Sequence, residues 1–345
     1  VEIFRHAGVT TVMITGDHVD TAYAIARQLG IAGHRSQCIT GRELERLDDT
    51  SFLKRIKDLR VYARVTPAQK VRIVKGLQLN GEIVAMTGDG VNDAPSLKAA
   101  DIGVAMGTGV DVAKQAADMI LADDNFATIE KAIEEGRGVY ENIRKSVIFL
   151  LSSNLGELMT MFVAVAMGLA SPLKSSHILW INLITDSLPA IAIGMEPPEE
   201  GLLKEPPRNP KEGILTMSFI RDILVQGGLI AAATMWAYTT GLHEGGPGRA
   251  CTMAFSTLTL ARLFHGFNCR SSHSIIRLGL GSNLYSVMAF QLGALLLAAV
   301  LFVPGLQIMF AAADLSLSQL STIVSAAFLP TLVIQIHKII KESIA

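Results

Sequence analysis

Six long apolar segments in the second half of the chain place the strongest limit on its fold. Each is long enough to cross a bilayer, because about 20 apolar residues in an α-helix span the hydrocarbon core. Helices are the expected structure, since the backbone polar groups of such a segment must be satisfied internally. The predicted spans are residues 146–169, 177–195, 217–241, 250–268, 284–304 and 319–338.

The positive charges between these segments favour an even number of spans. If residue 140 is cytoplasmic, the joints after the second and fourth spans and the C-terminal end are cytoplasmic as well. Cationic residues gather there, as the positive-inside rule requires: Lys204, Arg208, Lys211, Arg221, Arg270, Arg277, Lys338 and Lys341. The opposite joints carry only Lys174 and Arg249. The segment from Glu196 to Pro210 is rich in proline and is expected to form a structured cytoplasmic loop.

Charged residues are dense up to about Lys145 and sparse afterwards, which is typical of a soluble part joined to a membrane part. The formal net charge of -1 gives no reason to expect a nucleic-acid partner. The three cysteines show no metal-type spacing, so neither zinc nor a disulfide framework is expected. The chain opens on Val1 with no visible signal peptide, and we expect it to begin inside a larger protein.

The soluble part alternates short β-rich runs with helical patterns. Helices are expected over residues 20–29, 69–79 and 110–117, with Pro67 at a first helical position. Residues 40–58 are charged and helical in character, and we expect an exposed excursion there. The expected strands cover residues 11–15, 61–65, 83–85, 102–106 and 119–122. This alternation predicts a parallel, Rossmann-type α/β sheet with helices on both faces.

Two carboxylates follow one of these strands. Asp89 and Asp93 lie in the run Thr87-Gly88-Asp89-Gly90-Val91-Asn92-Asp93-Ala94-Pro95, between an apolar strand and a helix start. Ligands bind at the carboxyl ends of parallel strands, and glycines let the backbone come close to a bound group. Hard oxygen ligands in this position favour Mg²⁺ and phosphoryl chemistry, with Asn92 as a further partner.

Residues that follow two other predicted strands are suited to the same phosphoryl chemistry. Thr15, Gly16 and Asp17 offer a hydroxyl and backbone amides to a phosphoryl oxygen. Lys70 offers a compact positive charge, which would offset the charge that develops during phosphoryl transfer.

Polar residues inside the first two spans indicate an ion site, because each is costly in hydrocarbon. Asn154 and Glu157 share a helix face in the first span, as do Asn182, Thr185 and Asp186 in the second. Pro189 removes a backbone donor nearby. An all-oxygen, net negative site of this kind favours a hard cation, with Ca²⁺ preferred for its flexible coordination.

The soluble motifs, in this order, resemble those of haloacid-dehalogenase-type (HAD) phosphotransferases and, more narrowly, the phosphorylation domain of P-type ATPases. The run Thr87–Pro95 is the most specific of them. The resemblance implies ATP and Mg²⁺ as cofactors and an aspartyl-phosphate cycle. The nucleophilic aspartate of such enzymes is missing here, so it would lie upstream with the actuator and nucleotide-binding regions and four further spans.

The membrane part resembles calcium-transporting P-type ATPases of the sarco/endoplasmic-reticulum type. The resemblance is carried by Ser152–Glu157 and Leu179–Ala190. It implies that the spans are the fifth to tenth of ten. It also implies the following cation ligands: Asn154, Glu157, Asn182, Thr185 and Asp186.

One residue departs from that family. The segment Thr252–Arg262 matches a segment of that family in which a glutamate ligand occupies the place of Arg262. A guanidinium cannot ligate a cation. We therefore predict that Arg262 pairs with Glu157 and that one Ca²⁺ is carried per cycle, held mainly by Asn182 and Asp186. The alternative has Arg262 reaching out to a membrane interface.

The expected organisation is a partial HAD-like domain over residues 1–128, a helical stalk over 129–145 and a six-helix transmembrane bundle over 146–345. The stalk is expected to continue into the first span as one helix, the alternative being a turn at Gly136. The expected activity is ATP-driven Ca²⁺ export across a bacterial plasma membrane. The alternatives are a pump for Mn²⁺, Na⁺ or H⁺, a membrane-anchored HAD-type phosphatase, and a non-catalytic half that needs a separate partner.

Overall fold

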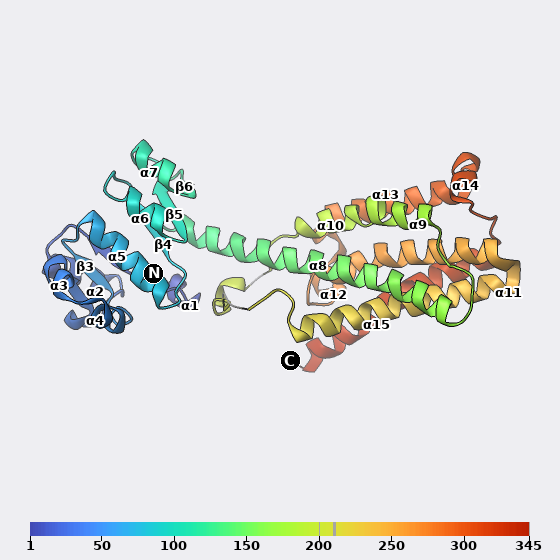
Figure 1. The fold of residues 1–345 in the computed structure, drawn as a ribbon, viewed down its shortest axis with the longest axis horizontal. Helices are drawn as coiled ribbons and strands as arrows, with labels where there is room; N and C mark the ends of the chain where they lie inside the picture. The colour runs from blue at the N-terminus through green and yellow to red at the C-terminus, as the bar shows by residue number, and fades with distance from the viewer. Residues whose placement is uncertain (200, 210–211, 345) are drawn as a thin grey trace. The chain divides into compact units, whose positions relative to one another are not determined.

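The computed structural model describes residues 1–199, 201–209 and 212–344. It divides into two compact units (Figure 1). The first contains Val1–Gly136 and a loop segment that ends at Arg208, and the second contains Arg137–Glu199 and the segment that begins at Asn209. The residues outside the described ranges are Glu200, Pro210 and Lys211, from the expected loop after the second span, and Ala345.

The first unit has parallel strands, as expected, but among the described residues they form two sheets. One sheet has the order β1-β3-β2, formed by β1 (Met13–Thr15), β3 (Val61–Ala63) and β2 (Cys38–Thr40). The other has the order β4-β5-β6, formed by β4 (Ala85–Gly88), β5 (Ile102–Met106) and β6 (Met119–Leu121). The strands β1 and β4, which end at the predicted phosphoryl-binding loops, are both edge strands.

Helices follow the strands much as the sequence predicts. The α5 helix starts at Pro67, and the Thr66 hydroxyl and the Gln69 side chain cap its first turn reciprocally. The helices of this unit are α1 (Glu2–His6), α2 (Val19–Gln28), η1 (Arg35–Gln37), α3 (Gly41–Arg46), α4 (Asp49–Arg55), α5 (Pro67–Leu79), α6 (Ala94–Ala99) and α7 (Asp111–Ala116).

The helical character predicted for residues 40–58 is confirmed and most of these residues are exposed, but the segment is not an excursion detached from the core. The segment folds into α3 and α4, which bury Leu44, Phe52 and Ile56 in one hydrophobic cluster with Tyr62 of β3. The two helices are too short for their few apolar positions to show a clear helical period among many charges. The same segment begins beside β2, a strand that the sequence pattern did not reveal.

The stalk and the first span form one helix, α8 (Thr128–Ala166), of 39 residues. It runs through Gly136 and Gly138 without interruption, so the alternative turn at Gly136 does not occur. The remaining elements of the second unit are α9 (Ser175–Trp180), η2 (Ile181–Thr185), α10 (Ser187–Gly194), α11 (Met217–Cys269), α12 (Ile275–Leu278), η4 (Leu280–Ser282), α13 (Leu284–Phe302), α14 (Pro304–Phe310) and α15 (Leu317–Ile344). The loop segment of the first unit carries η3 (Leu202–Lys204).

Five helices in the described part of the chain are long and apolar enough to cross a membrane. One of them, α11, has 53 residues and is interrupted at Gly246, whose φ of 76° is followed by Pro247. The chain doubles back there, since a Cβ on Gly241 would lie 2.7 Å from the Cα of Ala250. The two halves of α11 therefore correspond to the third and fourth predicted spans.

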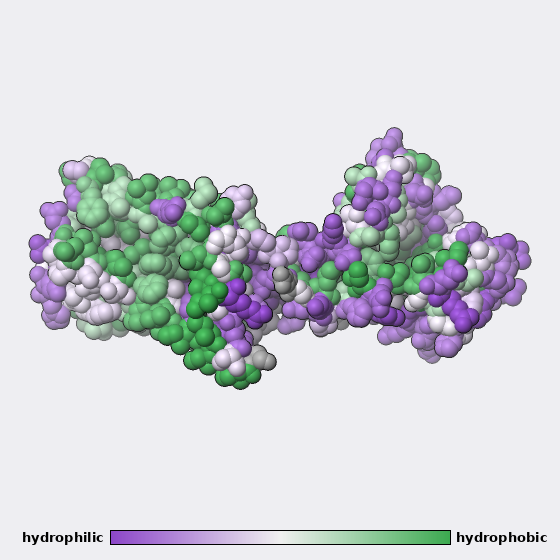
Figure 2. Space-filling model, turned by 180° about the vertical axis from the view of Figure 1, so that it is seen from behind, coloured by the Kyte–Doolittle hydropathy of each residue, from purple (hydrophilic) through white to green (hydrophobic). Residues whose placement is uncertain are grey.

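The outer surface of the helical unit suits a lipid environment. Figure 2 shows hydrophobic residues spread over this unit and hydrophilic residues over most of the α/β unit. Large apolar side chains on α8 and η2 point outward, among them Leu158, Phe162 and Leu183, each more than 60% exposed. Such a surface is typical of helices that face hydrocarbon.

A buried ion pair joins the end of α10 to the end of α11. Arg270 donates to both carboxylate oxygens of Glu196, at 3.0 and 2.9 Å, and Asn283 donates to the same carboxylate at 2.7 Å. Neither charged side chain is more than 5% exposed. The sequence pattern suggests only a charge in a cytoplasmic joint at Arg270, whereas the structure makes it an internal cross-link.

We expect Arg270→Met to destabilise the protein by about 3–5 kcal/mol, because it leaves the buried Glu196 carboxylate without its cation. Thermal unfolding of the purified, detergent-solubilised protein measures this. The double variant with Glu196→Leu should lose less than Arg270→Met alone, since it leaves no unpaired charge. An unchanged unfolding midpoint for Arg270→Met would contradict the assignment of this pair as a structural cross-link.

Candidate functional site

The first predicted loop forms a compact turn at the carboxyl end of β1. The backbone N–H of Asp17 donates to the Thr15 hydroxyl at 3.1 Å, and that hydroxyl donates to the Asp17 carboxylate at 3.0 Å. Gly16 and Asp17 are exposed. The hydroxyl and amides of this loop are therefore accessible to a phosphoryl oxygen.

The structure brings Lys70 and Asp93 into direct contact. The Lys70 ammonium lies 2.5 Å from Oδ1 of Asp93, and both side chains are largely buried. The other carboxylate oxygen of Asp93 accepts from the backbone N–H of Gly90 at 3.2 Å. Asp93 thus anchors the lysine of α5 to the loop after β4, and the lysine charge is held beside that loop.

Gly88 makes this approach possible, because a Cβ there would lie 2.4 Å from the Cβ of Asp93. We expect Gly88→Ala to displace Asp93 from Lys70 and to slow phosphoryl transfer in the complete protein by about 10²-fold, as a misplaced active-site group does. The matched control is Gly90→Ala, whose Cβ would make an ordinary 3.5 Å contact with Asp93. Equal rates for the two variants would contradict this assignment.

Asp89 is the carboxylate best placed for a divalent cation. It follows β4 directly and is exposed, and no hydrogen bond or ion pair within the described ranges engages its side chain. Its backbone carbonyl accepts from the N–H of Val110, which fixes the loop. Asn92, also exposed, lies nearby in sequence. Mg²⁺ binds through one or two carboxylates with water and phosphate oxygens, so this donor set fits Mg²⁺ as part of a site.

The predicted ion-binding helix is irregular where its polar residues lie. Residues Ile181–Thr185 form a π-helical turn, in which the N–H of Asp186 donates to the carbonyl of Ile181. Pro189 follows in α10 and has no N–H to donate to the carbonyl four residues before it. Such π-turns are frequent at functional sites. Irregular backbone inside a helix of membrane length, such as Ser175–Gly194, is typical of helices that bind ions in membranes.

Arg262 is the centre of the polar cluster among the spans. Its guanidinium donates to the Glu157 carboxylate at 2.7 Å, to the Asp186 carboxylate at 2.7 Å and to the Asn182 amide oxygen at 3.2 Å. It also donates to the backbone carbonyl of Ser153 at 2.7 Å. The cluster therefore joins α8, the π-turn and the second half of α11.

The pairing of Arg262 with Glu157 is confirmed, and the alternative of an arginine reaching an interface is wrong, because Arg262 is only 1% exposed. In the structure the guanidinium also binds Asn182 and Asp186, the two residues predicted as the main Ca²⁺ ligands. Its flat fork of donors reaches several acceptors at once. Some buried polar atoms of the cluster keep no partner among the described residues: Oδ1 of Asp186, Nε of Arg262 and the hydroxyl of Ser153.

Two other predicted ligands stand apart from the Arg262 cluster. Asn154 is exposed, although it shares part of a helix face with the buried Glu157. Residues three apart on a helix differ by about 60° in direction, so one can face the bundle while the other lies at its edge. Thr185 is buried, and its hydroxyl donates to the carbonyl of Trp180 at 3.4 Å.

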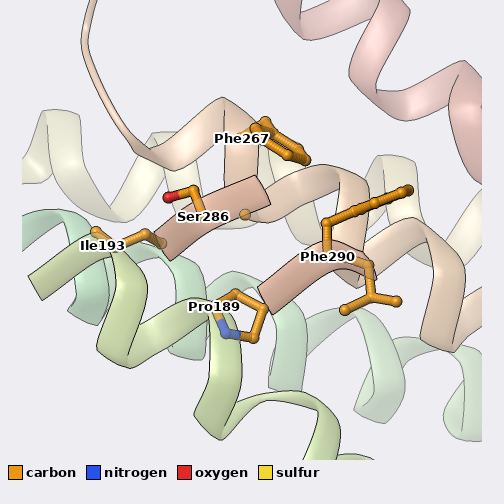
Figure 3. A pocket seen from close by; sticks show the side chains of 7 residues that line it. Pro189, Ile193, Phe267, Ser286 and Phe290 are labelled. Carbon is orange, nitrogen blue, oxygen red and sulfur yellow. The ribbon is translucent and has the colours of Figure 1, made fainter. Parts of the chain in front are cut away.

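A small cavity lies beside Pro189, between α10, the second half of α11 and α13 (Figure 3). Gly266 lets α11 approach, since a Cβ there would lie 3.1 Å from that of Pro189. The cavity is lined almost entirely by apolar groups: Pro189, Ile193, Leu263, Gly266, Phe267, Ser286 and Phe290. Its walls offer no charged group, so it is a packing gap beside α10 and not a candidate ion site.

Sequence reasoning missed one contact of the cluster and two buried polar residues that follow Arg262 on α11. The carbonyl of Ser153 could not be found from sequence, because every residue carries one. His265 and Asn268 could have been found, since both are polar residues inside the fourth predicted span. Within the described ranges, no three His, Cys, Asp or Glu side chains are grouped to hold a metal. Hydroxyl, amide and carbonyl oxygens would therefore have to complete both a cation site at Asp89 and one at Glu157 and Asp186.

Comparison with known proteins gives consistent matches over most of the chain. Residues 170–340 match a family described as cation transporting ATPase, C-terminus. Residues 1–101 and 70–133 match two families described as haloacid dehalogenase-like hydrolase.

Individual relatives agree with these families. Calcium-transporting ATPase 1 of Bacillus cereus is 44% identical over 98% of this chain and 40% of its own length. The calcium-transporting ATPase of Bacillus subtilis is 45% identical over 95% of this chain and 37% of its own length. Human calcium-transporting ATPase type 2C member 1 is 41% identical over 98% of this chain and 37% of its own length. The chain thus spans about two fifths of the length of these relatives.

Proposed function

The chain belongs to the cation-transporting P-type ATPases, and we propose that it supplies the ion site and part of the phosphorylation site of an ATP-driven Ca²⁺ pump. Its first unit is HAD-like, and its second is a multi-pass helical unit with several apolar helices of membrane length. Transport would be coupled to an aspartyl-phosphate formed elsewhere in the complete polypeptide.

One observation carries the Ca²⁺ assignment: Glu157 and Asp186, from different helices, are buried around one centre within membrane-length helices. Two carboxylates in such a place are costly unless an ion or a cation partner uses them. Asn154, Asn182 and Thr185 would add neutral oxygen ligands. Flexible coordination by several oxygens is characteristic of Ca²⁺.

The number of ions follows from Arg262. Glu157, Asp186 and Arg262 together carry one net negative charge, which suits one divalent cation better than two. The guanidinium also takes space and hydrogen-bonding capacity from both carboxylates. We therefore propose one Ca²⁺ per cycle. Its binding requires Arg262 to release at least Asp186 and Asn182, which would then serve as the main ligands.

The phosphorylation site would use the residues at the edges of the two sheets. Thr15, Gly16 and Asp17 would bind phosphoryl oxygens, while Lys70, held by Asp93, would supply positive charge. Asp89, with Asn92 and Asp93 nearby, would hold Mg²⁺. When bound there, Mg²⁺ offsets charge on the phosphoryl group transferred from ATP.

We propose the boundaries expected from sequence: a partial phosphorylation domain over residues 1–128, a stalk over 129–145 and six spans from residue 146 onward. Because α8 is continuous from Thr128 to Ala166, it could carry movement of the first unit to Glu157. The actuator, the nucleotide-binding region and four more spans would come from the rest of the polypeptide. The two Bacillus relatives support a bacterial plasma membrane, with its lipid bilayer, as the location.

The test is ATP hydrolysis by the complete purified protein in the presence of Ca²⁺, Mn²⁺, Na⁺ or K⁺. A Ca²⁺ pump should be stimulated by micromolar Ca²⁺, and Asp186→Asn should remove the stimulation. Stimulation by another ion alone would change the assigned cargo. Hydrolysis that no ion affects would indicate a membrane-anchored phosphatase instead.

A further inference from the structure

His265 lies one helical turn after Arg262 on α11 and is fully buried. Its Nε2 atom lies 2.8 Å from the hydroxyl of Ser152 on α8, and its ring stacks on that of Phe149, also on α8. Ser152 directly precedes Ser153, whose carbonyl accepts from Arg262. The contacts of His265 and Arg262 with α8 are therefore neighbouring cross-links between the same two helices.

The donors and acceptors around His265 can be assigned by starting from a backbone N–H group, because such a group can only donate. The N–H of Ile275 donates to Oε1 of Gln335 at 2.8 Å, which identifies the oxygen end of that amide. The nitrogen end of Gln335 then donates to Oδ1 of Asn268 at 2.9 Å. Consequently the amide nitrogen of Asn268 faces Thr331, at 2.9 Å, and Nδ1 of His265, at 3.4 Å.

This chain of bonds determines the form of the imidazole. Because Asn268 presents a donor, Nδ1 of His265 must accept, and the ring proton of the neutral form is on Nε2. The Ser152 hydroxyl directs its own hydrogen to the carbonyl of Ile148 at 2.6 Å. It can therefore accept from His265 Nε2–H. A directed chain of hydrogen bonds runs from the start of α12 through α15 and α11 to α8.

We propose that His265 is a positioning residue for the ion site: its Nε2–H bond to Ser152 sets where the Ser153 carbonyl and Glu157 of α8 meet Arg262. This inference rests on the proposed Ca²⁺ transport function. Losing the bond would let α8 shift against α11, so Arg262 and the carboxylates would be held less well for binding Ca²⁺. The effect should appear in Ca²⁺ affinity and not in phosphoryl transfer.

The experiment measures Ca²⁺-stimulated ATP hydrolysis of the complete protein as half-saturating Ca²⁺ and maximal rate. Ser152→Ala and His265→Leu should each raise half-saturating Ca²⁺ about five- to tenfold, the worth of about one buried hydrogen bond, with little change in maximal rate. The double variant should have the same half-saturating Ca²⁺ as the more affected single variant, because each substitution removes the same hydrogen bond. His265→Gln keeps a donor at the Nε2 position and should restore most of the affinity, whereas His265→Asn should not.

Cys269→Ala is the matched control, since its sulfur lies 3.3 Å from the same Nε2 but belongs to the same helix as His265. It should leave half-saturating Ca²⁺ unchanged. Unchanged affinity in Ser152→Ala, additive effects in the double variant, or equal behaviour of the Gln and Asn variants would overturn the proposal. Ser152→Ala removes a single atom, so this arm remains decisive if His265→Leu does not fold. A wild-type protein that Ca²⁺ does not stimulate would instead refute the proposed function.

Discussion

Replacing Arg262 with glutamate is expected to raise the number of Ca²⁺ ions bound per complete protein molecule from one to two. The substitution removes a guanidinium that donates to Glu157, Asp186 and Asn182, and adds two carboxylate oxygens in its place. The charge of the cluster changes from one net negative to three, which suits a second divalent cation. Equilibrium binding of radioactive Ca²⁺ to the purified protein measures the number directly.

Two controls separate the charge of Arg262 from its shape. Arg262→Lys keeps a cation but loses the flat fork, so it should still bind one Ca²⁺. Arg262→Met leaves two buried carboxylates without a partner and should lose about 3–5 kcal/mol of stability when Ca²⁺ is absent. If Arg262→Glu bound a single ion at saturating Ca²⁺, the role assigned to Arg262 would be wrong.

Substitutions at Asp89 and Asp186 are expected to separate phosphorylation from ion binding. Asp89→Asn should lower phosphoenzyme formation by about 10²-fold or more, because it removes the carboxylate proposed for Mg²⁺. Ca²⁺ binding should remain, since the ion cluster contains no residue of the first unit. Asp186→Asn should abolish Ca²⁺ binding and still allow phosphorylation from inorganic phosphate.

The measurements are incorporation of radioactive phosphate, from ATP or inorganic phosphate, and Ca²⁺ binding on the same samples. Asp58→Asn is a suitable control in the first unit, because Asp58 is exposed and belongs to neither proposed site. It should lower phosphoenzyme formation much less than Asp89→Asn does. Equal loss of both activities in either Asp89→Asn or Asp186→Asn would contradict the division of labour between the two units.

Local sequence patterns were sufficient for most of the elements. The β-rich runs around Ile14, Tyr62 and Val104 are strands, and the capping pair Thr66 and Gln69 begins α5 where expected. Helical continuity from Glu130 to Asn154 could also be foreseen, because no proline or polar turn interrupts it. These features depend on neighbouring residues, which the sequence shows directly.

Features that depend on distant contacts were harder to foresee. The burial of Leu44 and Phe52 depends on the strands beside which α3 and α4 fold. The Arg262 cluster was foreseen only in part: its charge suggested a carboxylate partner, but binding to Asp186 and the Ser153 carbonyl depends on how three helices meet. The exposure of Asn154 depends on the same packing angle.

The most direct test of the whole account is the coupling ratio of the complete protein in sealed vesicles, measured as Ca²⁺ ions transported per ATP hydrolysed. If Arg262 leaves room for one Ca²⁺ at Glu157 and Asp186, the ratio should be near one. A ratio near two would contradict the role of Arg262, and ATP hydrolysis without Ca²⁺ uptake would contradict the pump itself.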